Sequence, residues 1–346
     1  MCIALLSNAH PDYALILINN RDVCREKEYR DTVLTELRPC QEYLHRPTEP
    51  VHWWAPPNEN VLGARDLLRK EQGTWLGITK HGRIAVLTNF REEVDFRMEA
   101  RSRGSMVTAF LTQSTDCEGS TESFIESLTE GEGLKGVGGF SLVCGKIGEP
   151  LAVISNRTPN IEGTPWIMKN SGETIGLSNA AFEDRSWPKV LKGEKLLASA
   201  IKNNIAQQDS QAALIEDMFR ILSDDTLPKR PKGVGWNVYL NELRKSIFIP
   251  AIGGEGADGL SAEDLAAANS QHVIVGSDTD KDDGLSGVYG TQKQTVVLVD
   301  HHGKVTFVER SLYGAKGKIM PAAERDRIYE FGIEKWRKME GDDRSM

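Results

Sequence analysis

Short apolar runs separated by turn residues recur at both ends of the chain, and this pattern restricts the folds open to it. Runs with the length and composition of β-strands, several joined by glycine-containing turns, fall at residues 2–7, 13–19, 75–79, 82–88, 139–145, 150–155, 295–299 and 304–309. Stretches with helical periodicity fall at 105–112, 121–129, 187–202, 210–223, 261–269 and 321–337. Strands at both ends with helices between them predict antiparallel sheets covered by helices, an α+β layered sandwich.

Length and charge narrow the choice further. The length of 346 residues would allow two domains, but large sheet sandwiches often form one, and we expect a single domain over residues 1–346. The net charge of −8 argues against nucleic acid or an anionic membrane as the main partner. No stretch approaches the about 20 apolar residues of a membrane-spanning helix. The opening apolar segment is broken at residues 8–12 and has no basic leader, so it predicts a hairpin rather than a signal peptide.

The cysteines indicate a reducing compartment. Five of them, at positions 2, 24, 40, 117 and 144, form no Cys-x-x-Cys pair. An odd and scattered set is typical of free thiols rather than of a disulfide framework. We therefore expect an intracellular protein.

Cys2 follows the initiator methionine, and this position opens a specific chemistry. Removal of Met1 would make Cys2 the first residue of the chain, with a free α-amine beside its thiol. That amine could accept the thiol proton, which provides the paired nucleophile and base of covalent catalysis. The alternative is that Cys2 is a small apolar side chain that packs at the start of a strand.

Several motifs occur along nearly the whole chain in the order found in a known family. They are Cys2, Asn20-Arg21-Asp22, His45-Arg46-Pro47, Gly73-Thr74-Trp75-Leu76-Gly77-Ile78, Leu87-Thr88-Asn89-Phe90, Gly176-Leu177-Ser178-Asn179-Ala180 and Tyr289-Gly290-Thr291. On these residues the chain resembles the NRDE family, whose eukaryotic members are called transport and Golgi organisation protein two. The resemblance implies the four-layer αββα fold of the N-terminal-nucleophile hydrolases. Relative to that family the chain carries a surface insert at about 24–44, and it ends in a polar tail from about 338.

The resemblance also implies catalytic residues around Cys2, which occupies the nucleophile position of the cysteine members of that superfamily. Those enzymes place an arginine and an aspartate at the end of the second strand, and Arg21 and Asp22 match them. Asp22 would orient the amine, whereas Arg21 would favour the thiolate or bind an anion. Adjacent strand residues point to opposite faces, so only one of the two can face Cys2 unless a β-bulge intervenes.

Asn89 and Asn179 complete the catalytic residues that the resemblance implies. Each follows a short apolar strand, where the related hydrolases use asparagines. Their amide nitrogens could donate to a developing oxyanion. Equally, both could bond the backbone at the ends of their strands, as asparagine often does.

Ligand binding is expected from a set of residues that overlaps the catalytic one. These residues are Asn20, Arg21, Asn179 and Lys293. Many relatives carry an arginine directly after the Tyr-Gly-Thr motif, where this chain has Gln292 and then Lys293. A lysine keeps the charge but not the planar bidentate geometry of an arginine. Val23 likewise replaces the glutamate that ends the family signature, and these departures argue against catalysis.

Other sequence signals indicate no additional site. The acidic run at 278–284 lacks the glycine and glutamate positions of a calcium loop. His301 and His302 lie in a turn with no third histidine nearby, so we expect no metal. Trp75 is interpreted as a core aromatic side chain.

Three functions are compatible with these residues. In the favoured one, the protein binds a small-molecule or lipid-like ligand in a hydrolase-like cleft. The resemblance implies haem or acyl-CoA as that ligand. It also implies roles in haem and acyl-lipid handling and in secretory-pathway organisation at the Golgi. The second is a Cys2-dependent amidase, thioesterase or acyl transferase, whose chemistry needs no cofactor. The third is a non-catalytic adaptor in ER–Golgi traffic. We expect a cytoplasmic protein with mitochondrial or Golgi association, and the oligomeric state stays open.

Overall fold

The structure is a computed structural model that describes residues 2–26, 49–67, 70–89, 102–114, 120–131, 133–134, 136–228, 241–251, 287–313 and 319–336. The predicted helix at 261–269, the acidic run at 278–284 and the tail from about 338 lie outside these residues. The predicted insert at about 24–44 lies outside them from residue 27 onward, and its first three residues belong to a strand.

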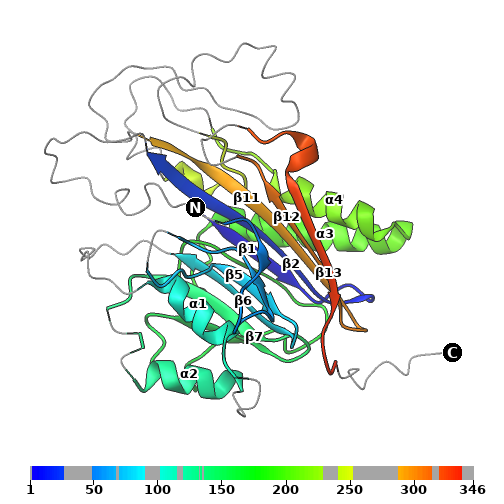
Figure 1. Ribbon diagram of the computed structural model, residues 1–346. Coiled ribbons are helices and arrows are strands. Elements are labelled where there is room, and N and C mark those ends of the chain that lie inside the picture. Colours follow the sequence, from blue (N-terminus) through cyan, green and yellow to red (C-terminus); the bar gives the residue numbers. More distant parts are fainter. Residues whose placement is uncertain are drawn as a thin grey trace, which may run out of the picture.

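Two antiparallel sheets form the middle of the molecule (Figure 1). Within the described residues, the first sheet has six strands in the order β10 (Thr174–Leu177), β1 (Ile3–Ser7), β2 (Tyr13–Glu26), β11 (Gly287–Asp300), β12 (Lys304–Ser311) and β13 (Asp326–Gly332). The second has seven in the order β3 (His52–Trp53), β4 (Val61–Gly63), β5 (Leu76–Thr79), β6 (Arg83–Asn89), β7 (Phe140–Lys146), β8 (Leu151–Ser155) and β9 (Trp166–Ile167). Strands from both ends of the chain therefore meet in one sheet, as β1 and β2 lie beside β11 and β12.

Helices cover the outer face of each sheet (Figure 1). They are α1 (Arg103–Leu111) and α2 (Thr121–Thr129) on the second sheet, and α3 (Pro188–Gln207) and α4 (Gln211–Leu222) on the first. Serine hydroxyls cap the N-termini of α2 and α4 by accepting from backbone N–H groups, and α3 begins with a proline, a residue suited to the first helical position. None of the helices in the described ranges is both long and apolar enough to cross a membrane.

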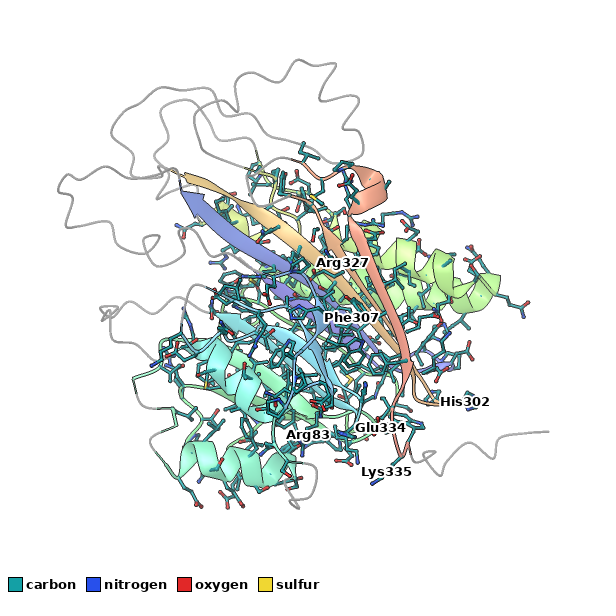
Figure 2. All side chains as sticks on the ribbon, in the orientation of Figure 1. Arg83, His302, Phe307, Arg327, Glu334 and Lys335 are labelled. Atoms are coloured by element: carbon teal, nitrogen blue, oxygen red, sulfur yellow. The ribbon has the colours of Figure 1, made fainter. Side chains whose placement is uncertain are left out.

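Alternation along the strands produces three apolar layers. On β1, Ala4 and Leu6 point toward the second sheet, whereas Ile3 and Leu5 point toward α3 and α4. Because β1 is covered on both faces, all of its residues are buried and it is apolar almost throughout. Phe307 of β12 lies in the layer between the sheets (Figure 2). The predicted α+β arrangement, a four-layer αββα sandwich, is confirmed.

The strand predictions were more accurate than the last helix prediction. All eight predicted strands are present, but the short strands β3, β4, β9 and β10 were not foreseen. The helix predicted at 321–337 is wrong, because this segment holds one short 3₁₀ turn and then strand β13. Tyr329, Phe331 and Ile333 recur at every second residue and pack on the layer between the sheets, a spacing that fits a strand and not a helix.

Candidate functional site around Cys2

Cys2 lies directly before β1, and neighbouring strands hold its backbone on both sides. The Ser178 hydroxyl donates to the Cys2 carbonyl over 2.7 Å, and the Asn19 amide nitrogen donates to the Ile3 carbonyl over 2.8 Å. Cys2 itself is only partly buried. The start of the chain is therefore fixed in position while the thiol-bearing residue keeps some contact with solvent.

Asn179 and Asn89 connect the two sheets beside Cys2. In the pairing of β1 with β10, Ala4 lies opposite Leu177, and the same register continued by two residues brings Cys2 opposite Asn179. The Nδ2 atom of Asn179 donates to the backbone carbonyl of Asn89, the last residue of β6 in the second sheet. The structure thus brings together three residues that the sequence predicted for one site.

The side-chain oxygens of these two asparagines are buried without a hydrogen-bond donor among the described residues. For Asn179 the orientation of the amide is set, because only its nitrogen can donate to the Asn89 carbonyl. Most buried polar atoms in proteins have a partner, so two unsatisfied acceptors in two contacting residues require an explanation. Water, or a ligand with N–H or O–H groups, could supply the missing donors.

Arg21 and Asp22 point to opposite faces of the first sheet, as their adjacency in a strand requires. Asn19 and Arg21 continue the row of β2 residues that faces the second sheet, whereas Asn20 and Asp22 continue the row that faces the helices. A bulge is present, but it lies on the partner strand β11, where Asp22 pairs with Thr291 and Arg21 pairs with Lys293. The extra residue is Gln292, one of the positions that departs from the family pattern.

Arg21 lies flat against the second sheet. Its guanidinium carbon is 3.6 Å from the ring centroid of Trp75, a stacked cation–π geometry. Trp75 precedes β5 and packs partly on the core beneath α1, so it is a core aromatic that also forms one wall of this site. Sequence reasoning assigned Trp75 to the core alone and missed the second contact.

Lys293 is buried in an ion pair of its own. Its Nζ atom lies 2.7 Å from a Glu309 carboxylate oxygen and 3.3 Å from the Glu49 carbonyl. The same Glu309 oxygen accepts from the Val51 backbone N–H over 3.0 Å. Burial lowers the pKa of Lys293, and the Glu309 carboxylate offsets part of that shift. These contacts make Lys293 part of the packing of strand β12 against the segment before β3, and its role in ligand binding stays a prediction.

Asp22 is oriented by the Tyr-Gly-Thr motif. The Thr291 hydroxyl donates to Asp22 over 2.7 Å and in turn accepts from the Ile249 N–H over 3.0 Å. Gly290 is required beside it, because a Cβ there would lie 2.9 Å from the Pro250 carbonyl oxygen. The motif therefore brings the segment around Ile249 close enough to β11 to fix the Asp22 carboxylate.

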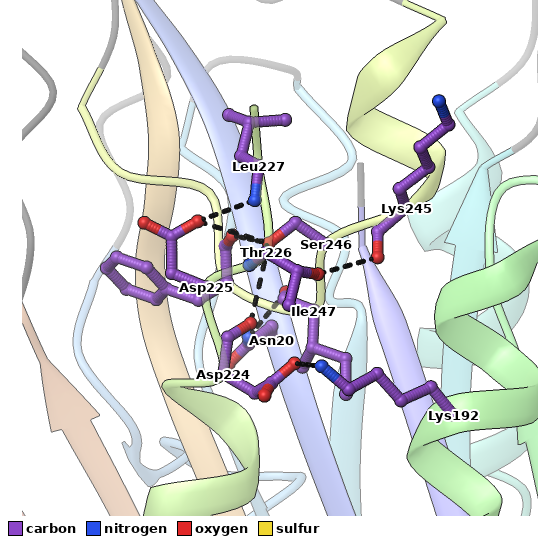
Figure 3. A network of polar contacts seen from close by, with 10 residues as sticks. Asn20, Lys192, Asp224, Asp225, Thr226, Leu227, Lys245, Ser246 and Ile247 are labelled. Atoms are coloured by element: carbon purple, nitrogen blue, oxygen red, sulfur yellow. Dashed lines mark hydrogen bonds and ion pairs between the residues drawn. The ribbon is translucent and has the colours of Figure 1, made fainter. Parts of the chain in front are cut away.

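Asn20 belongs to a polar network on the helix-facing side (Figure 3). Its side-chain nitrogen donates to the carbonyls of Leu222 and Ile247 over 2.7 Å and 3.0 Å, and the residue is fully buried. Both hydrogens are thereby directed at backbone groups that join the end of α4 to the segment before β11. These contacts give Asn20 a structural role, and its role in ligand binding stays a prediction.

Lys189 is a buried cation of α3 that the sequence gave no hint of. It is the second residue of α3 and is fully buried. Burial lowers the pKa of its ammonium group to about 8, and the Asp22 carboxylate and the Cys2 thiol offset part of that shift. The prediction of a helix from 187 placed Lys189 near a helix start, but periodicity does not say which strand lies beneath the first turn.

Metal binding gains no support from the parts of the chain that the structure describes. They contain no group of three His, Cys, Asp or Glu side chains close enough to share an ion. His302 lies on the exposed turn between β11 and β12 (Figure 2).

Comparison with known proteins places these residues in a family. The family model described as Transport and Golgi organisation 2 matches residues 1–314. The chain belongs to the Transport and Golgi organisation 2 family. The relatives called Transport and Golgi organization protein 2 homolog from Bos taurus and from Homo sapiens are each 29% identical to it, over 307 and 305 residues. The alignment covers 88% of this chain and of the bovine protein, and 87% of this chain and of the human one.

Two solved structures also resemble this member of the Transport and Golgi organisation 2 family, at a lower level. A Caenorhabditis elegans N-acylethanolamine-hydrolyzing acid amidase ortholog aligns at a TM-score of 0.38 and 10% identity, over 67% of this chain and 88% of its own. A mutant conjugated bile acid hydrolase from Clostridium perfringens aligns at 0.38 and 10%, over 96% and 97%. Likenesses of this size carry no weight, and the αββα arrangement rests on the sheets and helices described above.

Proposed function

We propose that this protein binds an acyl compound at the Cys2 site, with the acyl carbonyl next to the thiol. Acyl-CoA is the favoured class, because its pantetheine arm carries amide N–H groups and its phosphates carry negative charge. The residues that would hold it are Asn89 and Asn179 through their side-chain oxygens and Arg21 through its charge. The sequence predicted a lipid-like ligand, and we narrow that prediction to an acyl compound such as acyl-CoA.

The observation that carries the proposal is the pair of unsatisfied amide oxygens beside Cys2. A ligand that offered only acceptors would leave Asn89 and Asn179 unsatisfied, which costs about 1–3 kcal/mol for each buried group. A ligand with amide N–H groups removes that cost. The stacked guanidinium of Arg21, on the face of the sheet that points toward the second sheet, adds a positive charge suited to a phosphate or carboxylate.

Catalysis at Cys2 is the second candidate, and it is supported by the partly buried Cys2 beside Asn179, whose amide contacts the end of β6. The thiol sulfur would attack the acyl carbonyl, its proton would pass to the α-amine freed by removal of Met1, and the CoA thiol would leave with a proton. Water would then cleave the acyl-enzyme thioester and release the free acid. This reaction makes the protein a thioesterase, and transfer to an amine or alcohol would make it an acyl transferase.

Isothermal titration with palmitoyl-CoA tests the proposed binding site. We expect Asn179→Ala to weaken binding about tenfold, because a hydrogen bond to a buried acceptor is worth roughly that factor. The matched control is Asn170→Ala, which removes an exposed asparagine in the connection between β9 and β10. Equal affinity in both variants and in the wild type would refute the proposed site.

Two further measurements use the same proteins. Cys2→Ala should bind palmitoyl-CoA nearly as the wild type does. Any CoA release seen with the wild type should stop in this variant. Release that persists in Cys2→Ala excludes Cys2 as the nucleophile. Haem is titrated in parallel, since the family resemblance implies it as a ligand. Haem binding that depends on Asn179, with no binding of palmitoyl-CoA, would replace the acyl proposal.

We also propose a cellular role, which is supported by the names of the relatives. The names of the bovine and human relatives refer to transport and Golgi organisation, and we extend that role to this chain, together with acyl-lipid or haem handling. A tag at the C-terminus leaves Cys2 untouched and would report where in the cell the protein resides. Cytoplasmic signal with mitochondrial or Golgi association is the expected result, and a secreted or nuclear protein would contradict it.

A further inference from the structure

We infer that Ser178 is a positioning residue of the Cys2 site, because its hydroxyl holds the Cys2 carbonyl and so keeps the thiol-bearing residue beside Asn179. The inference rests on the proposed function only in that it concerns the same site. Its test measures the reactivity of Cys2 and needs no acyl compound.

Cys2 precedes the first residues of β1 that pair with a neighbouring strand. The pairing of β1 with β10 extends as far as Ala4, and the pairing with β2 extends as far as Ile3. Ser178 directly follows the last residue of β10, and its hydroxyl donates to the Cys2 carbonyl over 2.7 Å. This side-chain contact therefore extends the attachment of β1 to β10 as far as the residue that bears the thiol.

The donor of this contact is better shielded from water than the residue that it holds. Ser178 is 3% exposed, whereas Cys2 is only partly buried. Because water has little access to the Ser178 hydroxyl, removal of that hydroxyl would leave the Cys2 carbonyl without this donor and with no equivalent replacement. Ser178 is therefore placed to restrain Cys2 while the thiol-bearing residue keeps some contact with solvent.

The two residues after Ser178 are bound to the second sheet. The amide nitrogen of Asn179 donates to the Asn89 carbonyl at the end of β6. The Ser141 hydroxyl of β7 donates to the Ala180 carbonyl over 3.1 Å. Three successive residues thus attach the end of β10 to the start of β1, to β6 and to β7. The segment that holds the Cys2 carbonyl is therefore itself fixed between the two sheets.

The test is the rate at which iodoacetamide alkylates Cys2, quantified by peptide mass spectrometry. We expect Ser178→Ala to speed alkylation of Cys2 about fivefold, because loss of one ordinary hydrogen bond raises the population with a released chain start by roughly that factor. Ser178→Thr keeps a hydroxyl and should bring the rate back toward that of the wild type.

The matched control is Ser7→Ala, at the opposite end of β1. Ser7 is also a buried serine, and its hydroxyl donates to the Glu173 carbonyl over 3.0 Å. The substitution removes the same atom and a similar contact between β1 and the start of β10, so it should lower stability much as Ser178→Ala does. Urea denaturation compares the two losses. Alkylation of Cys2 in Ser7→Ala should equal that of the wild type.

A second variant covers the case in which Ser178→Ala does not fold. Ser178→Cys fills nearly the same space with a thiol that is only a weak donor, and peptide mass spectrometry separates its alkylation from that of Cys2. Wild-type alkylation of Cys2 in the folded variant, or an equal acceleration in Ser7→Ala, overturns the inference. Failure of the proposed function is a different result, since it would appear as absent palmitoyl-CoA binding in the wild type.

Discussion

Two lysines are buried on opposite faces of the six-stranded sheet, and their surroundings differ. Lys293 faces the second sheet and is held by Glu309 at 2.7 Å, with both side chains about 5% exposed. Lys189 comes from α3 on the helix-covered face, where burial lowers its pKa and the charges of Asp22 and Cys2 offset part of that shift. One lysine is held by a carboxylate that also binds the backbone, whereas the other is buried in the first turn of a helix.

The two buried charges therefore differ in how they are compensated. Glu309 accepts from both Lys293 and the Val51 N–H, so its contacts tie strand β12 to the segment before β3. Asp22 accepts from Thr291, a residue of the Tyr-Gly-Thr motif on which the family resemblance partly rests. The predictions below test the two faces in turn.

Glu309→Ala tests the structural lysine and should have the largest effect. Removal of one member of a buried ion pair leaves the other charge uncompensated, so we expect a loss of about 3–5 kcal/mol in the free energy of unfolding. Urea denaturation measures it. Glu330→Ala, which removes a half-exposed partner of Lys304, is the control and should cost about 0–1 kcal/mol. Similar losses in the two variants would show that burial of Lys293 has been overestimated.

Asn20→Ala tests the polar contacts on the helix-facing side of the first sheet. It removes the donors to the buried Leu222 and Ile247 carbonyls, and we expect a loss of about 2–4 kcal/mol in stability. Palmitoyl-CoA affinity should be unchanged in the folded fraction. A stable variant with weakened ligand binding would instead restore Asn20 as a binding residue, as the sequence had suggested.

The pH dependence of stability tests the buried lysine of α3. Burial lowers the pKa of Lys189 from 10.5 to about 8, so the folded state binds fewer protons than the unfolded state between these values. The free energy of unfolding should therefore rise with pH in this window, by about 1–2 kcal/mol between pH 8 and 9.5. Other groups, including Lys293, titrate as well, and subtraction of the Lys189→Met curve isolates the contribution. A difference curve that is flat over this window would contradict the burial of a charged Lys189.

Arg21→Lys should have the smallest effect on stability. The substitution keeps the charge but removes the planar stack on Trp75; a buried contact of this kind is worth about 2 kcal/mol, and we expect about half of it to be lost. Urea denaturation measures the stability of this variant, and palmitoyl-CoA titration measures its ligand affinity, so the two effects are separated. A loss of several kcal/mol would show that Arg21 belongs with Glu309 among the structural charges.

The sequence predicted the layers better than it predicted the site. Strands buried on both faces are apolar throughout, so the runs at 2–7 and 295–299 could be recognised without knowledge of their partners. The segment at 321–337 was misread because Pro321 and the following alanines resemble a helix start, while the alternation of Tyr329 and Phe331 becomes decisive only when β12 is beside it. Tertiary pairing overrode local propensity there.

At the site, residue types were predictable but their partners were not. The motif asparagines at 89 and 179 could be chosen from the sequence, and they do meet beside Cys2. Asn20 has the same side chain, yet the strand alternation turns it toward α4 and into backbone contacts. Lys189 was missed since burial of a helix start depends on the distance between α3 and β10, which close packing at Gly176 determines.

Protection of Cys2 by a bound ligand tests the central proposal most directly. The wild-type protein is alkylated with iodoacetamide in the absence and presence of a non-hydrolysable palmitoyl-CoA thioether, and each cysteine peptide is quantified. With the thioether at ten times its dissociation constant, alkylation of Cys2 should slow about tenfold, since roughly a tenth of the sites stay free. The other cysteine peptides serve as internal controls. A thioether that binds without slowing the alkylation of Cys2, or that does not bind at all, would contradict an acyl site at the start of the chain.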